Sequence, residues 1–184
     1  MAEQCTPNSS GMLACKASAS VIEEILKGES SQPSLDVACR NSSNDCAVSG
    51  SFESLTSFEE TCKKSNIKAK RLDVRCGYHS SAMDPITEPL KALGRSVRWL
   101  KPIIPVASGV HGRLLKADDL TDDYFAMHAR QPVRFSDVIQ SIDSAGGFRD
   151  AQCLELGPHP TVSTLVHSLL ASKSDPPIPA LKKG

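Results

Sequence analysis

One histidine at a strand-to-loop corner is the residue of this chain best suited to chemistry. A strand-like run over residues 67–74 stops at Gly77, and His79 follows two residues later, ahead of the helix-start signal Asp84-Pro85. An imidazole gains and loses its proton near neutral pH, so a half-buried histidine at such a corner suits general-base catalysis. The competing interpretation is structural, because most strand-end histidines are satisfied by packing and a backbone hydrogen bond.

The seven cysteines form neither a metal motif nor a disulfide framework. They are odd in number and scattered through apolar runs, a pattern that favours reduced, buried thiols. Cys76-x-x-His79 is a lone pair with no second pair at ligand spacing, so we expect no metal site. Cys76 has a second interpretation as a reactive thiol, which requires that its side chain be exposed near the corner.

Composition excludes several classes of partner. The 184 residues carry 21 basic and 21 acidic side chains, which gives no electrostatic footprint for nucleic acid or an anionic membrane. No apolar run approaches the length of a membrane span, and the first ten residues lack the basic-then-apolar order of a secretory signal. We therefore expect a cytoplasmic protein that binds neither nucleic acid nor membrane.

The elements that must position His79 begin with a compact pattern over residues 12–74. Apolar periodicity, a capping box at Ser20-x-x-Glu23 and the turn-rich stretch 41–45 predict strand, helix, strand, strand, helix and strand, at 12–17, 20–28, 35–39, 46–50, 54–64 and 67–74. This order is the split βαβ, or ferredoxin-like, arrangement. A stand-alone RNA-binding module of this topology is disfavoured, because the chain has no basic, aromatic-rich strand.

The second half reads as α/β. We expect a helix from Asp84-Pro85 that is short or kinked at Pro89, buried strands at 103–108 and 152–156, and helices at 118–130, from a Ser136 cap, and from Val162. Two strand–helix units are too few for a covered parallel sheet, so this half resembles part of a larger α/β domain with exposed edges and apolar faces. The expected division is lead-in 1–10, ferredoxin-like subdomain 11–75, partial α/β subdomain 76–171, and linker or tail 172–184.

Four blocks occur in an order that resembles one enzyme family. They are Gly11-Met12-Leu13-Ala14 with Lys16-Ala17-Ser18, Ala38-Cys39-Arg40-Asn41-Ser42, Gly77-Tyr78-His79-Ser80 with Met83-Asp84-Pro85-Ile86, and Gln131-Pro132-Val133-Arg134-Phe135 followed by Leu154-Glu155-Leu156-Gly157-Pro158-His159-Pro160. Together they resemble the malonyl-CoA:acyl carrier protein acyltransferase domain of polyketide synthases. The first block and the C-terminal Pro179-Ala180-Leu181-Lys182-Lys183-Gly184 look most like non-reducing iterative synthases of filamentous fungi. The resemblance covers residues 5–184 and implies a ferredoxin-like subdomain inserted in an α/β-hydrolase-like one.

The resemblance implies ping-pong acyl transfer with no bound cofactor. A serine takes malonyl from coenzyme A as an ester and passes it to the phosphopantetheine thiol of an acyl carrier protein, and His79 matches the general base. A backbone carbonyl near the turn Gly157-Pro158-His159 would orient the imidazole. Tyr78 matches a position that lines the acyl pocket, and Asn41 matches a hairpin residue near the cleft.

The nucleophile is the point of departure from the family pattern. The 184 residues contain no Gly-x-Ser-x-Gly motif, the sharp turn on which such a serine sits. Because nucleophile and base act as a unit, we expect this polypeptide alone to be inactive. Two interpretations stay open: an acyltransferase whose serine lies outside this sequence, or a non-catalytic remnant that binds a carrier protein or a parent multidomain synthase.

Overall fold

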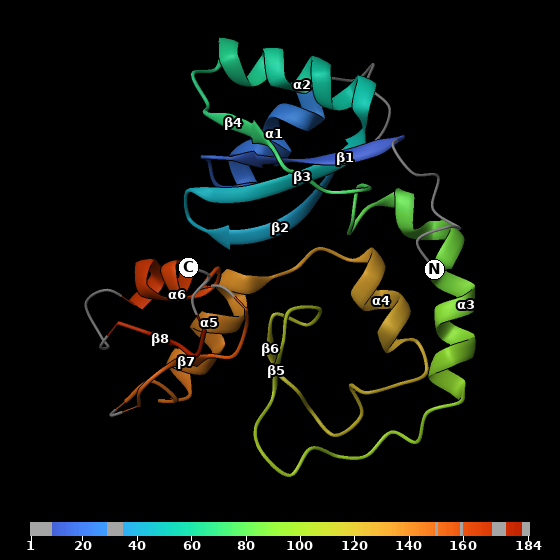
Figure 1. The fold of residues 1–184 in the computed structure, drawn as a ribbon, viewed down its shortest axis with the longest axis vertical. Helices are drawn as coiled ribbons and strands as arrows, with labels where there is room; N and C mark the ends of the chain where they lie inside the picture. The colour runs from blue at the N-terminus through green and yellow to red at the C-terminus, as the bar shows by residue number, and fades with distance from the viewer. Residues whose placement is uncertain (1–8, 29–34, 150, 159, 171–175, 182–184) are drawn as a thin grey trace.

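The computed structural model describes residues 9–28, 35–149, 151–158, 160–170 and 176–181. A four-stranded sheet with two helices on one face forms one part of the molecule. Further helices, and strands of only two residues each, form the other part (Figure 1). No helix within these residues is long and apolar enough to cross a membrane.

The first part has the element order that the sequence predicts. The elements are β1 (Ser10–Cys15), α1 (Ala19–Gly28), β2 (Asp36–Ser42), β3 (Asp45–Ser51), α2 (Phe52–Lys64) and β4 (Ala69–Arg71). The strands pair antiparallel in the order β2-β3-β1-β4. β4 is shorter than the predicted 67–74, and the capping box is wrong. The Ser18 hydroxyl, not that of Ser20, accepts the Val21 N–H at the start of α1.

The main core lies between this sheet and its helices. Alternate strand residues such as Leu13 and Val48 meet Ile22 of α1 and Phe58 of α2, and all four are fully buried. Three thiols, Cys15, Cys46 and Cys62, lie in the same cluster, as expected for buried cysteines. Burial of this kind is the main favourable free energy of folding, so this part is expected to be the most stable.

The second part has shorter elements. They are η1 (Ser81–Met83), α3 (Asp84–Arg95), β5 (Ala107–Ser108), β6 (Arg113–Leu114), α4 (Tyr124–Arg130), α5 (Phe135–Ser144), β7 (Leu154–Glu155), α6 (Ser163–Leu170) and β8 (Ile178–Pro179). α3 begins at Asp84 and continues through Pro89, so the short-helix alternative is wrong. α3 packs on α4 around Met83, Ile86 and Leu90, and the missing Cβ of Gly94 admits the Asp122 carbonyl.

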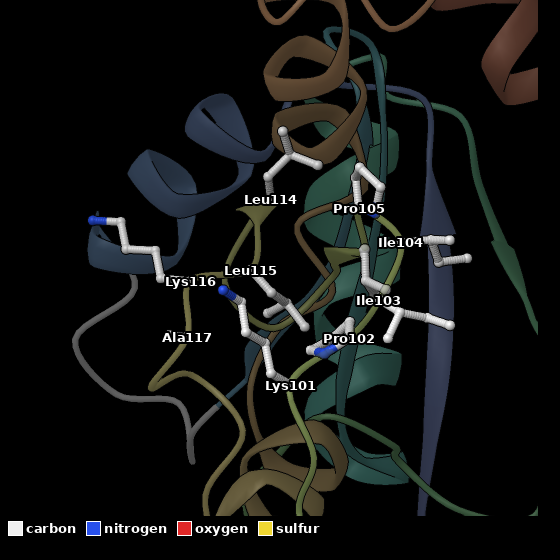
Figure 2. Close-up of a pocket in the computed structure, with 10 residues that line it drawn as sticks. Lys101, Pro102, Ile103, Ile104, Pro105, Leu114, Leu115, Lys116 and Ala117 are labelled. Atoms are coloured by element: carbon white, nitrogen blue, oxygen red, sulfur yellow. The ribbon is translucent and has the colours of Figure 1, made fainter.

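The predicted buried strand at 103–108 is wrong. Only Ala107–Ser108 is a strand, paired antiparallel with β6, while Ile103 is 100% and Ile104 69% exposed. Residues 101–106 and 114–117 instead border an open hollow of about 380 Å³, with the Lys101 and Lys116 side chains at its rim (Figure 2). No other described element covers these side chains. A buried strand in this segment would need parallel neighbouring strands, and the described residues supply none beside it. The expectation of exposed apolar faces is therefore confirmed here.

Three further boundaries differ from the sequence prediction. Helix 118–130 shortens to α4, because Asp119 accepts hydrogen bonds from Arg113 and from the Lys116 N–H and holds a loop there. Ser136 is not a cap, since α5 already begins at Phe135. The strand at 152–156 shortens to β7, which pairs in parallel with β8 from the predicted tail.

Candidate functional site

The corner that carries His79 is fixed by the sheet. The Ser10 hydroxyl at the start of β1 accepts the Gly77 N–H at 2.9 Å, and the Ser49 hydroxyl of β3 donates to the Tyr78 carbonyl at 2.6 Å. Ser80 closes the turn by donating to the Gly77 carbonyl at 2.6 Å. A Cβ at Gly77 would lie 3.1 Å from the Gly11 carbonyl oxygen, so glycine allows this close approach. The four-stranded sheet therefore sets the position of the corner.

His79 has an unusual backbone conformation that two hydrogen bonds hold. Its φ is 58°, in the left-handed region that few residues with a Cβ adopt. Its N–H donates to the Ala129 carbonyl at 3.2 Å, and its Nδ1 lies 3.0 Å from the Gln131 carbonyl oxygen. Such strain persists only where the surroundings determine it, and it is common at functional sites. Both acceptors come from the C-terminal end of α4.

The carbonyl that orients the imidazole therefore differs from the predicted one. The sequence prediction placed it at the turn Gly157-Pro158-His159, but it belongs to Gln131. His159 lies outside the described residues, and no described hydrogen bond joins Gly157 or Pro158 to His79. Those residues follow β7 and lead towards α6, whose first turn Glu155 caps by accepting the N–H groups of Thr161 and Val162.

The hydrogen bond determines which nitrogen of His79 can act as a base. A carbonyl only accepts, so Nδ1 must carry the proton, and the lone pair of the neutral ring is on Nε2. Burial of the side chain lowers the pKa of His79 below its ordinary value, while the bond to the Gln131 carbonyl opposes the shift. The imidazole is thus held neutral at physiological pH, in the form that accepts a proton from a hydroxyl or thiol.

The segment that supplies the Gln131 carbonyl is attached to the sheet edge. Val133 donates to the Ala38 carbonyl and accepts the Arg40 N–H, both at 2.8 Å, so it forms a parallel bridge with β2. Gln131 precedes a proline, which disfavours helical geometry and leaves Gln131 extended with ψ of 155°. α4 therefore ends there, and the Gln131 carbonyl is free to meet His79. The Gln131-Pro132 pair signals the helix end in the sequence, but nothing in the sequence shows which side chain the carbonyl meets.

Charged groups around the corner are paired with one another. Arg130 Nε donates to Asp84 at 2.7 Å, and the same guanidinium lies 3.6 Å from Asp36. Asp36 also accepts the Ser81 N–H at 3.0 Å, so one carboxylate joins β2, α4 and η1. Arg134 pairs with Asp137 at 2.7 Å. Both arginines that flank Gln131-Pro132-Val133 thus have intramolecular carboxylate partners.

The remaining candidate residues are Tyr78, Asn41 and Cys76. Tyr78 is 41% exposed, and its carbonyl is held by Ser49. Asn41 Nδ2 donates to Asp45 at 2.9 Å and closes the β2–β3 hairpin, with no described contact to His79. Cys76 is only 7% exposed, so the condition for its reactive-thiol interpretation is not met. The described residues contain no group of three His, Cys, Asp or Glu side chains that could hold a metal ion.

A carbonyl-oriented, neutral histidine is the kind of group that activates a hydroxyl or thiol nucleophile. Comparison with known proteins identifies the family. The profile of the family described as "Acyl transferase domain" matches residues 3–182. A non-reducing polyketide synthase of Cladonia metacorallifera is 34% identical over 185 residues, which are 100% of this chain and 9% of that protein. The orsellinic acid synthase of Beauveria bassiana is 34% identical over 191 residues, with the same two shares. The chain belongs to the acyl transferase domain family.

Solved structures support the fold assignment. The acyltransferase domain from the second module of the salinomycin polyketide synthase matches with a TM-score of 0.88 at 23% identity, covering 99% of this chain and 42% of that one. The malonyl CoA-acyl carrier protein transacylase from Clostridium perfringens matches with a TM-score of 0.88 at 23% identity, covering 100% and 57%. The chain therefore has the α/β fold of part of an acyltransferase domain, and it spans about 9% of the length of its curated relatives.

Proposed function

We propose that this chain is the part of a polyketide synthase acyltransferase domain that supplies the general base. The domain would move malonyl from coenzyme A to the phosphopantetheine thiol of an acyl carrier protein, with His79 as the base. The observation that carries the proposal is the 3.0 Å contact between His79 Nδ1 and the Gln131 carbonyl, which leaves Nε2 as the proton acceptor. We also assign the β1–β4 sheet with α1 and α2 as the ferredoxin-like subdomain, and residues 76–171 as part of the α/β-hydrolase-like one.

The proposed chemistry has two proton-transfer cycles at Nε2. A serine hydroxyl gives its proton to His79 and attacks the malonyl thioester carbonyl, and the released coenzyme A thiolate takes the proton back. In the second half, the carrier thiol gives its proton to His79 and attacks the acyl-serine ester, and the serine oxygen recovers the proton. A base with a lowered pKa stays neutral between the two halves, so burial of His79 serves both. Tyr78 would line the acyl pocket, and Asn41 would lie near its entrance.

The serine must come from outside these 184 residues, which contain no Gly-x-Ser-x-Gly motif. We therefore propose that the remainder of a cytoplasmic multidomain synthase supplies it. A transfer assay needs that remainder, so the 191-residue match in the Beauveria bassiana orsellinic acid synthase should be replaced by residues 1–184 of this chain. The chimera is expected to load malonyl and pass it to the carrier protein, followed by mass spectrometry of both proteins.

Within this chimera, His79→Ala tests the base and His167→Ala is the matched control. Loss of the base should reduce transfer by roughly 10²–10⁴-fold or more. His167, an exposed residue of α6, should leave the rate unchanged. If the chimera with His79→Ala transfers malonyl at the rate of the His167→Ala protein, His79 is not the base.

The alternative is a non-catalytic remnant that binds a carrier protein or a parent synthase. The exposed apolar side chains of Ile103, Ile104 and Leu156 favour a surface that another protein covers. The chimera separates the two functions. Neither predicts an acyl adduct when the chain alone is incubated with malonyl-CoA, but only the remnant predicts an inactive chimera. Binding of the carrier protein by that inactive chimera, measured by sedimentation, would then support the remnant.

A further inference from the structure

We propose that His128 is a positioning residue for His79: its imidazole packs edge-on against the His79 ring, keeps Nδ1 aimed at the Gln131 carbonyl, and, when protonated, disfavours a second proton on His79. The proposal deepens the function proposed for His79. Nothing in the sequence pattern points to His128, which reads as an ordinary surface residue of α4.

The packing is direct. The centroids of the His79 and His128 rings lie 6.3 Å apart, with their planes at 64°, an edge-to-face arrangement. His128 is exposed and His79 half-buried, so of the two rings that of His79 lies deeper in the corner. The backbone that follows His128 supplies two acceptors for His79, the carbonyls of Ala129 and Gln131. One short stretch of α4 therefore contacts the imidazole through its backbone and through a side chain.

The His128 ring is itself held in place. Tyr124 lies one helical turn before it, with ring centroids 6.4 Å apart. The Tyr124 hydroxyl is 2.8 Å from the Ser108 hydroxyl of β5, and its ring lies 6.0 Å from Trp99 and 6.1 Å from His111. Tyr124, anchored to β5, thus packs against His128, and His128 packs against His79. A neighbouring ring that is held in this way can restrict the orientation of the His79 imidazole, whereas a freely rotating surface side chain cannot.

Within the described residues, a charge on His128 would not be cancelled by a paired carboxylate, unlike the charge on Arg130. Arg130 is the nearest cation on α4, and it is paired with Asp84 of α3 and Asp36 of β2. The Tyr124 ring, which also packs against His128, carries no positive charge. A proton on His128 therefore adds a positive charge beside His79. This repulsion acts in the same direction as burial in lowering the pKa of His79, whereas the hydrogen bonds to the backbone of Gln131 and of His128 raise it.

Two variants separate the ring contact from the charge. His128→Phe keeps an aromatic edge and removes the charge, whereas His128→Ala removes both. His167→Gln, on the exposed face of α6, is the control for removing a histidine elsewhere. The full chain is labelled with ¹⁵N-histidine, and long-range ¹H–¹⁵N spectra report the tautomer and the titration midpoint of His79 without serine, substrate or partner.

We expect the wild-type His79 ring to be neutral with the proton on Nδ1. His128→Phe should retain that tautomer and raise the titration midpoint of His79 by roughly 0.3–0.8 pH units, the repulsion expected for a screened charge at this separation. His128→Ala should raise the midpoint similarly and give a mixture of the two tautomers. His167→Gln should change neither. A wild-type tautomer in His128→Ala, or an unchanged midpoint in His128→Phe, overturns the proposal, and because no transfer is measured, neither result bears on whether His79 is the base.

Discussion

The two parts of this chain bury similar apolar runs to very different extents. β1 and β3 pair over six residues, and Leu13, Val48, Leu55 and Phe58 beside them are completely buried. β5 and β7 have two residues each, and the apolar run before β5 includes Ile103, which is entirely exposed. The first part forms all its strand pairs within about 60 residues of chain, whereas the second part needs neighbours that its own described strands do not supply. An apolar run thus predicts a strand only where partners exist to pair with it.

The candidate site lies where the two parts meet, and it takes its order from both. Ser10 and Ser49 of the sheet hold the backbone of the corner, and the end of α4 holds the imidazole. β2 in turn holds the end of α4 through Val133. The geometry of His79 is therefore expected to persist even where the apolar surface around Ile103 is uncovered. Four predictions test this contrast between the two parts of the chain.

The largest effect is expected in the core between the sheet and its helices. Phe58→Ala should lower the free energy of unfolding by roughly 3–5 kcal/mol, because it removes a fully buried ring and leaves a cavity. Ile103→Ala, at the fully exposed position, should change it by no more than about 0.5 kcal/mol. Urea denaturation followed by circular dichroism measures both, and equal losses would show that Ile103 is buried in solution.

The next largest effect is expected at the hydrogen bond that joins the sheet to the His79 corner. Ser10→Ala removes the acceptor of the Gly77 N–H, and leaving that buried donor unsatisfied should cost about 1–3 kcal/mol. Ser168→Ala removes an exposed hydroxyl that bonds the Leu165 carbonyl and serves as the control. Hydrogen exchange of the His79 amide is the sharper readout. Faster exchange only in Ser10→Ala would support the role of the Ser10–Gly77 hydrogen bond in fixing the corner. Unchanged exchange would mean that α4 alone fixes it.

Sequence reasoning predicted local features better than contacts between distant segments. The element order over residues 12–74 follows from periodicity and turn residues, which act over a few positions. The contact between His79 and Gln131 joins residues 52 positions apart, and no pattern within either segment specifies it. The true cap at Ser18 and the hydrogen bonds that Asp119 accepts were missed for a related reason: several nearby polar residues could serve, and packing selects among them.

A smaller effect is expected from the ion pairs beside the corner. Arg130→Met breaks the contacts with Asp84 and Asp36 and should cost about 0.5–1 kcal/mol, since the partners are partly exposed and screened. Lys91→Met removes the pair with Glu88 within one helix and should cost less. Thermal melts at low and high salt measure both losses, and each should shrink with salt because both pairs are partly exposed. Equal losses would show that Arg130 does not join the two parts.

The smallest effect is a local one, at the capped start of α6. The Ser163 side chain and the N–H groups of Val162 and Thr161 lower the pKa of Glu155 to about 2. A depressed carboxyl pKa stabilises the fold above its unfolded value of about 4.3, and that stability is lost as pH falls towards 2. Protection of the Val166 amide, which bonds the Val162 carbonyl, should therefore fall between about pH 5 and pH 3 in the wild type. In Glu155→Gln it should be low at both pH values, whereas Glu88→Gln, on α3, should behave as wild type. Wild-type protection in Glu155→Gln would show that packing of Val166 and Leu170 alone maintains this helix.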